Sequence, residues 1–385
     1  YANAAWASTS SLTGATPMGT GNKYNEKMSW NIMGYDPADA TQQQLLEQGW
    51  ELTPDPLDPT KQIIFKDTNP SDYAFNNPSL TQDYNINMSG GNERGNYYAG
   101  LGYNKSEGIP VKSFYKRYSF VLNGSYQINN WLKSISNFNY NRANWQSMPG
   151  SQTSEANYFG RLLSLPHTAR FVDEQGNPVL GTSVGDGNQY YQPEKWQIDN
   201  QTDKFTMSQS FEAKLMRGLT LKAMGTWYYS EGVYENFTKD FKTNNNGSYN
   251  RNRSTSDEFG RDFSQTYNMV INYNGEVVKN HNIDVMLGTE YYDLKTRGFY
   301  AAGSGAPTDD FQDLALTSNK EGKRSIDSWH SQYRILSYFG RANYNFMSKY
   351  LFSAVFRYDG YSSLLGDNRW GFFPGLSAGW LFYQE

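Results

Sequence analysis

Histidine is the side chain most often used for metal binding and acid–base chemistry near neutral pH. This sequence contains three: His167, His281 and His330. None lies beside another histidine, or beside carboxylates at the spacing of a metal site. Cysteine is absent, so disulfides and thiolate ligands are excluded. No stretch resembles a nucleophile elbow, although a Ser-His-Asp assembly built from distant positions stays open. We expect isolated histidines, with no catalytic residue, metal or cofactor.

Two carboxylates could carry glycosidase chemistry, which requires an acidic pair at a defined separation. Glu212 and Glu290 lie on the polar phase of two alternating segments. They could instead pair with basic neighbours such as Lys214, Lys222 or Arg341, or contact another part of the protein. We expect this second arrangement, because charges on a wet face of a sheet usually pair with one another.

Glycine-rich stretches predict no ligand loop. Gly90-Gly91 and Gly303-x-Gly305 do not open a helix after a strand, so they indicate no phosphate cradle. The GDGN stretch at 185–188 lacks the remaining ligands of a calcium loop.

Three aromatic residues are the candidate substrate contacts: Tyr190, Tyr191 and Trp196. They fall in a long predicted loop, 141–203, and loops are where binding residues concentrate. Exposed aromatic rings can stack on sugar rings or on peptide side chains. The alternative is that they pack within the loop or against a partner protein, and both possibilities stay open.

The composition restricts the class of protein that positions these residues. The 385 residues are 37% hydrophobic but 16% aromatic, with 31 Tyr and 10 Trp. The aromatic content argues against disorder, whereas the hydrophobic content is low for the core of a soluble domain. A net charge of −4 without a basic block gives no support for nucleic-acid binding. No run of 18 apolar residues predicts a membrane helix.

Strict two-residue alternation of apolar and polar residues is the dominant pattern. In a strand, successive side chains point to opposite faces, so each alternating segment predicts a strand with one apolar and one polar face. Eleven such segments occur: 83–89, 96–103, 119–126, 132–140, 205–215, 219–229, 263–273, 281–291, 335–346, 350–359 and 370–381.

Three features indicate that the apolar face contacts lipid. Short turns alternate with mostly long loops (141–203, 230–262, 292–333), as in outer-membrane barrels. Aromatic residues gather at strand ends, as at the two membrane interfaces. Charges within the strands fall on the polar phase: Asp83, Lys133, Glu212, Lys214, Lys222, Asp284, Glu290, Arg341 and Arg357.

The fold class predicted is therefore all-β, a transmembrane antiparallel β-barrel over 83–385. A soluble sandwich would have shorter strands and a core richer in Val, Ile and Leu. Residues 1–82 are predicted to be an irregular extracellular loop region with one short helix at 38–49, capped near Asp36-Pro37. The proline-rich stretch 52–61 is excluded from a central strand.

Two stretches resemble the SusC/RagA family of TonB-dependent outer-membrane transporters. At 84–140 the matching elements are SGGN, G-x-x-x-x-E-G-I and the N-W-L-K turn; at 336–385 they are the KYL strand start and the R-x-D-G-x-S loop. The resemblance implies a 22-stranded barrel with an N-terminal plug, a SusD-like surface lipoprotein as lid, and TonB as the energy source. Eleven strands are half of that number, so we expect the chain to be an internal fragment of a longer transporter, without its plug or TonB box.

The resemblance implies outer-membrane import of nutrients, with oligosaccharides as the first expectation and oligopeptides as the alternative. The expected location is the outer membrane of a Gram-negative cell. A non-transporting adhesive β-protein that binds glycans is the rival from another class, and a barrel enzyme is the third.

Overall fold

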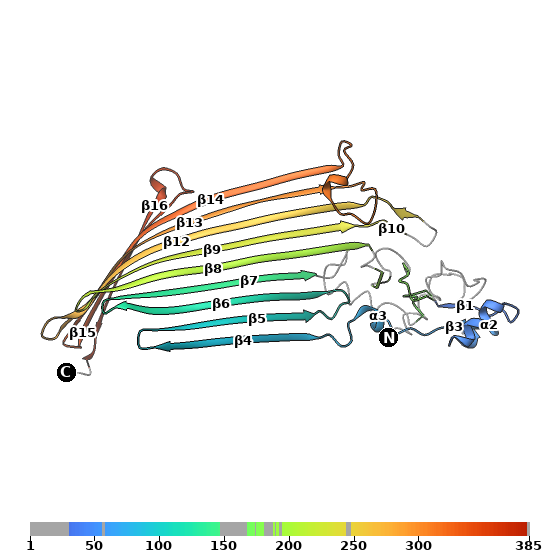
Figure 1. Cartoon of the computed structure of the whole chain (residues 1–385), viewed down its shortest axis with the longest axis horizontal. Helices are drawn as coiled ribbons and strands as arrows, with labels where there is room; N and C mark the ends of the chain where they lie inside the picture. Colours follow the sequence, from blue (N-terminus) through green and yellow to red (C-terminus); the bar gives the residue numbers. More distant parts are fainter. Residues whose placement is uncertain are drawn as a thin grey trace.

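A computed structural model describes residues 31–55, 58–146, 168–173, 175–180, 188, 190–191, 195–243 and 248–382. Eleven strands form one antiparallel sheet whose order follows the chain. The predicted number of sheet strands and the all-β class are confirmed. The strands lie side by side from β4 to β16 (Figure 1). Their bounds are β4 Thr81–Asn92, β5 Gly95–Glu107, β6 Phe114–Asn129, β7 Leu132–Gln146, β8 Trp196–Met216, β9 Leu219–Thr238, β12 Ser254–Val278, β13 His281–Gly303, β14 Arg324–Phe346, β15 Tyr350–Tyr361 and β16 Trp370–Trp380.

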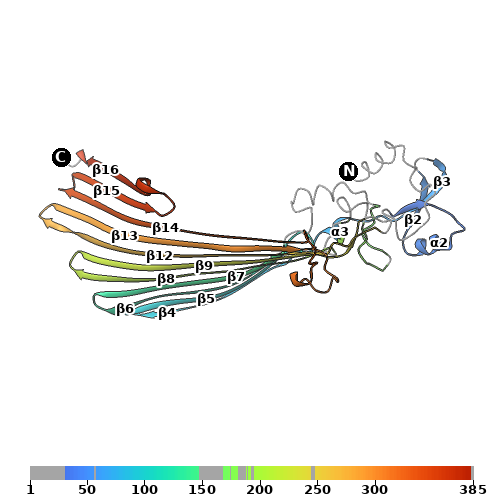
Figure 2. The same cartoon turned by 90° about the horizontal axis from the view of Figure 1, so that it is seen from above.

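The sheet is curved, and its two ends differ. Seen from above, the strands follow an arc from β4 to β16 (Figure 2). The tight turns all lie at one end of the sheet, on the left of Figure 1. Three of these turns use a left-handed backbone, at Gly218 (φ 80°), at Asn280 (φ 68°), and at Met347 and Ser348 (φ 57° and 58°). Glycine and asparagine are the residues that adopt this conformation most readily, which explains their position there.

The strands extend beyond their predicted ends on the loop side. β8 begins at Trp196, β9 continues to Thr238, and β13 continues to Gly303. The predicted loops 141–203, 230–262 and 292–333 therefore shrink to 147–195, 239–253 and 304–323. The second of them carries a two-stranded ribbon, β10 (Phe241–Lys242) and β11 (Tyr249–Asn250). Cross-strand hydrogen bonding continues where hydrophobic alternation has stopped, so the pattern underestimates strand length.

The cross-strand register separates the two phases onto two faces. Lys133, Glu212 and Lys222 are direct partners on β7, β8 and β9. This row of directly opposed residues continues across β12, β13 and β14 to Arg357 on β15. The nine charges predicted on the polar phase all share this face.

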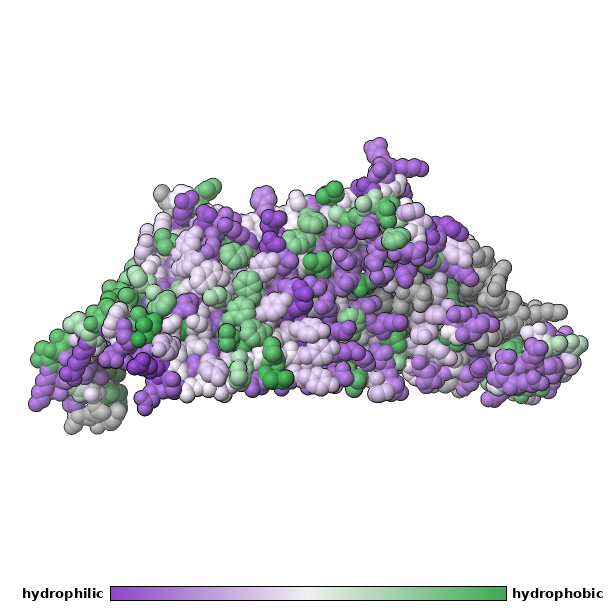
Figure 3. Space-filling model, in the orientation of Figure 1, coloured by the Kyte–Doolittle hydropathy of each residue, from purple (hydrophilic) through white to green (hydrophobic). Residues whose placement is uncertain are grey.

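The opposite face is apolar and exposed. Ile86 is 73% exposed, Met88 60% and Leu287 50%. Hydrophobic side chains gather mainly over the half of the sheet nearer the short turns (Figure 3). A protein surface in water rarely leaves so large an apolar area uncovered. We refer to this side as the outward face, and to the polar side as the concave face.

Residues 31–65 fold differently from the prediction. A three-stranded sheet, ordered β1 (Ile32–Gly34), β3 (Asp58–Phe65) and β2 (Glu51–Asp55), replaces the expected irregular region. The prolines are tolerated because Pro54 lies on the edge strand β2, and Pro59 precedes the part of β3 that pairs with β1.

The predicted helix is present as α2 (Ala40–Glu47), and a four-residue helix, α3 (Ser71–Ala74), follows later in the chain. The cap of α2 is Asp39 rather than the predicted Asp36-Pro37, because the Asp39 carboxylate accepts a hydrogen bond from the Thr41 amide at 2.8 Å. This helix completes a small dry core of Met33, Leu45, Trp50 and Ile64.

Candidate functional site

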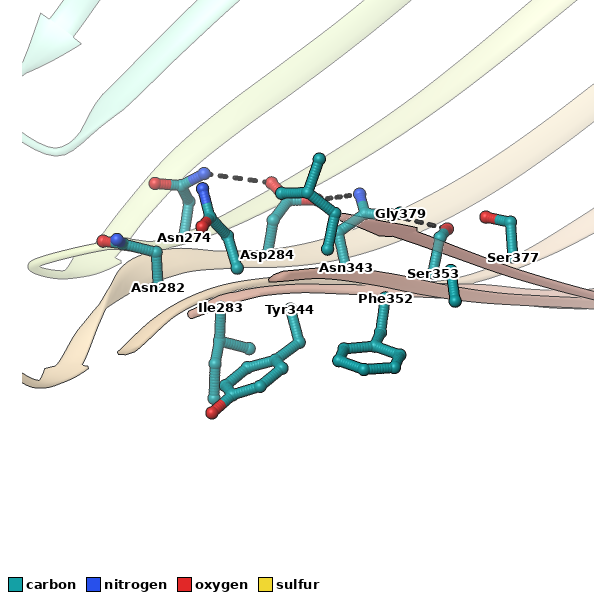
Figure 4. A pocket seen from close by; sticks show the side chains of 13 residues that line it. Asn274, Asn282, Ile283, Asp284, Asn343, Tyr344, Phe352, Ser353, Ser377 and Gly379 are labelled. Carbon is teal, nitrogen blue, oxygen red and sulfur yellow. Dashed lines mark hydrogen bonds between the residues drawn. The ribbon is translucent and has the colours of Figure 1, made fainter. Parts of the chain in front are cut away.

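The concave face carries a hydrogen-bonded polar network near the short turns. Asp284 on β13 accepts bonds from Asn274 at 3.0 Å, from Arg341 at 3.1 Å and from Asn343 at 3.3 Å. Ser353 donates to Asn343 at 2.7 Å. Figure 4 shows Asn274, Asp284, Asn343 and Ser353 on the side toward which the other strands curve. Ile283, Tyr344 and Phe352 lie on the opposite side. Asn274, Asp284, Asn343 and Ser353 contribute to the lining of a hollow of about 550 Å³.

A second charged group lies farther along the same face. Arg357 on β15 donates to Asp359 at 2.9 Å, to Ser337 at 2.9 Å and to Glu290 at 3.4 Å. Glu290 therefore pairs with Arg357, which was predicted on the polar phase but not among the partners of Glu290. Arg341, which was predicted among those partners, pairs with Asp284 instead. Sequence alone could not assign these partners, because they come from strands joined by long connections.

The structure does not bring Glu212 and Glu290 together. Glu212 lies on β8 and Glu290 on β13, with β9 and β12 between them. At about 4.8 Å per strand their backbones are roughly 14 Å apart, whereas paired glycosidase carboxyl groups are about 5–9.5 Å apart. Glu212 has basic residues on both sides, because Lys133 and Lys222 lie directly opposite it.

The histidines are also separate. His281 contacts the hydroxyl of Tyr344 at 2.7 Å and packs on Phe346 at the short-turn end of β13. His330 lies toward the loop end of β14, opposite Arg297. His167 lies outside the described residues. Within the part of the chain that the structure describes, no three His, Asp or Glu side chains form a metal-binding group.

The three candidate aromatic residues divide between two clusters. Tyr190 packs edge-on against Tyr73, with ring centroids 5.9 Å apart, and Tyr73 stacks on the buried Phe171. Tyr191 and Trp196 belong to the other cluster, at the start of β8. Trp196 lies beside Phe241, with ring centroids 6.1 Å apart, and the Tyr191 hydroxyl accepts a bond from the Lys242 amide at 3.3 Å.

Lys195 occupies the centre of this second cluster. Its ammonium lies 5.2 Å from the Tyr191 ring centroid, 5.3 Å from that of Trp196 and 5.4 Å from that of Phe241. The residue is 1% exposed, and burial lowers the pKa of its ammonium from the ordinary 10.5 to about 8. The rings stabilise the cation through cation–π contacts. Tyr191 and Trp196 thus pack against neighbouring side chains of the protein. Contact of Tyr190, Tyr191 or Trp196 with a ligand stays a prediction.

Sequence reasoning missed Lys195 and Phe241. Phe241 comes from the ribbon β10, far along the chain from Lys195, so no local pattern indicates their contact. The ribbon is itself anchored, because Arg253 bonds Asp240 at 3.0 Å and Asp309 at 2.8 Å. The loop end of the sheet therefore has fixed polar and aromatic contacts among its described residues.

Helices do not cross a membrane in the described part of the chain, since none there is both long and apolar enough.

Comparison with known proteins finds relatives among the TonB-dependent receptors. No family model matches the chain. A TonB-dependent receptor of Formosa agariphila is 26% identical over 336 residues, covering 80% of this chain and 31% of the relative. The TonB-dependent receptor SusC of Bacteroides thetaiotaomicron is 24% identical over 332 residues, covering 80% and 32%. The chain thus spans about a third of the length of these curated relatives.

A solved structure agrees with the fold. The RagAB peptide importer in its open-open state superposes with a TM-score of 0.70 at 21% identity, over 83% of this chain and 36% of that chain. The sheet therefore has the fold of part of a β-barrel wall. The likeness to TonB-dependent receptors indicates an outer-membrane location. The resemblance of the chain to TonB-dependent receptors of the SusC/RagA type is confirmed, and it extends over most of the described strands.

Proposed function

We propose that this chain forms part of the wall of a TonB-dependent nutrient importer. The observation that carries the proposal is the separation of faces: an exposed apolar face suited to lipid lies behind a continuous polar face. The polar face is rich in amide, hydroxyl and paired charged groups such as Asn274, Asp284 and Ser353. A polar lumen of this kind can hold water and hydrophilic cargo.

Oligosaccharides are the proposed cargo, with a SusD-like surface lipoprotein as lid and TonB as the energy source. The relation to receptors of the SusC type supports this choice, and amide and hydroxyl groups suit sugar hydroxyls. Oligopeptides are the second candidate, because the RagAB structure is described as a peptide importer. Residues 1–82 and the long connections are proposed to lie outside the cell, with the short turns on the periplasmic side.

Uptake by whole cells tests the proposal. Cells with and without the gene would receive labelled oligosaccharides and oligopeptides of matched size, with and without an uncoupler of the proton gradient. We expect uptake of at least one oligosaccharide to require both the gene and the gradient. Gene-dependent uptake of peptides alone would favour the second cargo. Wild-type uptake of every compound by the deletion strain would refute import.

Two rival activities have direct tests. Glycan binding by the purified full-length protein without any uptake would indicate an adhesive protein instead. Release of reducing sugar or of free amino groups from the same compounds would indicate an enzyme. We propose that the protein is not an enzyme, and the curated relatives carry the names of receptors.

A further inference from the structure

The outward face changes from apolar to charged at a defined level of the sheet. Following each strand from its short turn, the first outward charge comes after a run of mainly apolar, aromatic or small residues, interrupted by Gln209 on β8 and Gln265 on β12. These first charges are Lys105, Lys116, Arg142, Asp203, Glu231, Arg261, Asp293 and Arg334 on β5 to β9 and β12 to β14. From Leu132 to Arg142 the strand is long enough to cross the apolar layer, which takes about 9–11 residues.

Most of these charges neutralise one another across neighbouring strands. Three ion pairs form: Arg142–Asp203 at 2.7 Å, Arg261–Glu231 at 2.6 Å and Arg334–Asp293 at 3.6 Å. Tyrosines directly below support two of them, since the Tyr140 hydroxyl donates to Asp203 at 2.6 Å and the Tyr229 hydroxyl to Glu231 at 2.5 Å. A belt of aromatic rings below ion pairs matches the interface between hydrocarbon and headgroups.

One part of this belt is left with excess positive charge. Arg297 on β13 lies directly opposite Arg261 on β12 and opposite His330 on β14. Lys295 is the preceding outward residue on β13. Among the described residues, no hydrogen bond or ion pair reaches the side chains of Lys295, Arg297 or His330, and all three are exposed. Since Glu231 already neutralises Arg261, the facing Arg297 has a like-charged neighbour and no counter-ion.

We propose that Lys295, Arg297 and His330 bind phosphate groups of the glycolipid in the outer leaflet of the membrane. From Ile283 to Lys295 the strand rises about 30 Å along the membrane normal, at about 3.3 Å per residue and a tilt of about 40°. The apolar band of such barrels is about 25 Å tall, so the cluster lies at headgroup level. The guanidinium fork of Arg297 suits phosphate oxygens, and Lys295 adds a point charge.

The proposal rests on the outer-membrane location and is independent of the cargo. Its test is a titration of the purified full-length protein in detergent with bisphosphorylated lipid A, followed by native mass spectrometry. The variant is K295Q/R297Q, and the matched control is K320Q/K323Q, which removes the same charge from exposed positions in the connection between β13 and β14. R297K keeps the charge but removes the fork.

We expect K295Q/R297Q to bind lipid A about 10- to 30-fold more weakly, K320Q/K323Q to match the wild type, and R297K to fall between them. Dephosphorylated lipid A should bind all variants alike, and inorganic phosphate should not displace lipid A at millimolar concentration. Equal binding of lipid A by wild type and K295Q/R297Q would overturn the proposal. An equal loss of lipid A binding in K320Q/K323Q would also overturn it. So would a K295Q/R297Q variant that binds lipid A normally but no longer binds a protein partner.

Discussion

The small unit at residues 31–65 and the eleven-stranded sheet use the same apolar residue types in opposite ways. Ile64 in the small unit is 0% exposed and packs with Met33, Leu45 and Trp50. Ile86 on β4 is 73% exposed, and its neighbours on the outward face are exposed as well. The small unit excludes water by packing on itself. Among the described residues, no second layer of protein covers the outward face of the sheet. Lipid therefore covers it instead.

The largest expected difference in stability is between isoleucine substitutions in the two regions. Ile64→Ala leaves a cavity in a closed core and should lower the local free energy of unfolding by about 2–5 kcal/mol. Ile86→Ala should cost about 1 kcal/mol, because lipid tails fill the space and no cavity remains. Hydrogen exchange of the amides around each site, in the full-length protein in vesicles, measures both. Equal losses would show that the outward face is packed like a core.

A charge on the sheet should separate its two faces. Leu287→Arg places a cation in the middle of the outward band and should destabilise the protein by about 2–4 kcal/mol. Asn268→Arg is the matched change on the concave face, opposite Glu290, and should be nearly neutral. Denaturant titration after reconstitution in vesicles gives the difference. A neutral Leu287→Arg would contradict the assignment of this face to lipid.

The contrast between the two regions also explains what the sequence could predict. The eleven strands and their faces follow from alternation, because every strand in the band has lipid on one side and water on the other. Strand ends such as Trp196 and Gly303 could not be predicted, since the outward face turns polar at the level of Asp203 and Glu231 and alternation disappears there. The small sheet was missed because Pro54 and Pro59 resemble loop residues.

The candidate aromatic residues show a different limit. Tyr190, Tyr191 and Trp196 are close together in the sequence, yet their partners Tyr73 and Phe241 come from distant segments. Contacts of this range depend on the fold of the connections and leave no periodic pattern.

Lys195 gives the next effect, through pH. Its folded pKa of about 8 lies below the ordinary 10.5, so between these values the unfolded segment binds more protons than the folded one. Local stability should therefore rise between about pH 8 and 10.5, by about 3 kcal/mol. Lys195→Met should abolish the rise. Hydrogen exchange of the amides around the start of β8, corrected for the intrinsic pH dependence of exchange, measures this local stability. A wild-type stability that does not change with pH would contradict the burial of Lys195.

The smallest effect belongs to the surface of the small unit. Lys61 and Asp58 form an ion pair at 2.9 Å, but both are solvent-exposed. Solvent screens such pairs, so Lys61→Gln should leave the stability of the small unit unchanged within error. A clear loss in thermal denaturation would mean that another part of the protein covers this surface.

The central claim is that the outward face of the sheet contacts lipid up to the row of ion pairs. These 385 residues contain no cysteine, so once any cysteine elsewhere in the full-length protein has been replaced, single cysteines from 283 to 297 on β13 can each carry a spin label in the reconstituted protein. Oxygen accessibility should peak at Ile283, Val285, Leu287 and Thr289, with water-soluble nickel reagent reaching the alternate positions. From Asp293 onward the outward positions should become accessible to nickel. Access of the nickel reagent to a label at position 287 would contradict a lipid-facing wall. So would protection of both outward and concave positions from both oxygen and nickel.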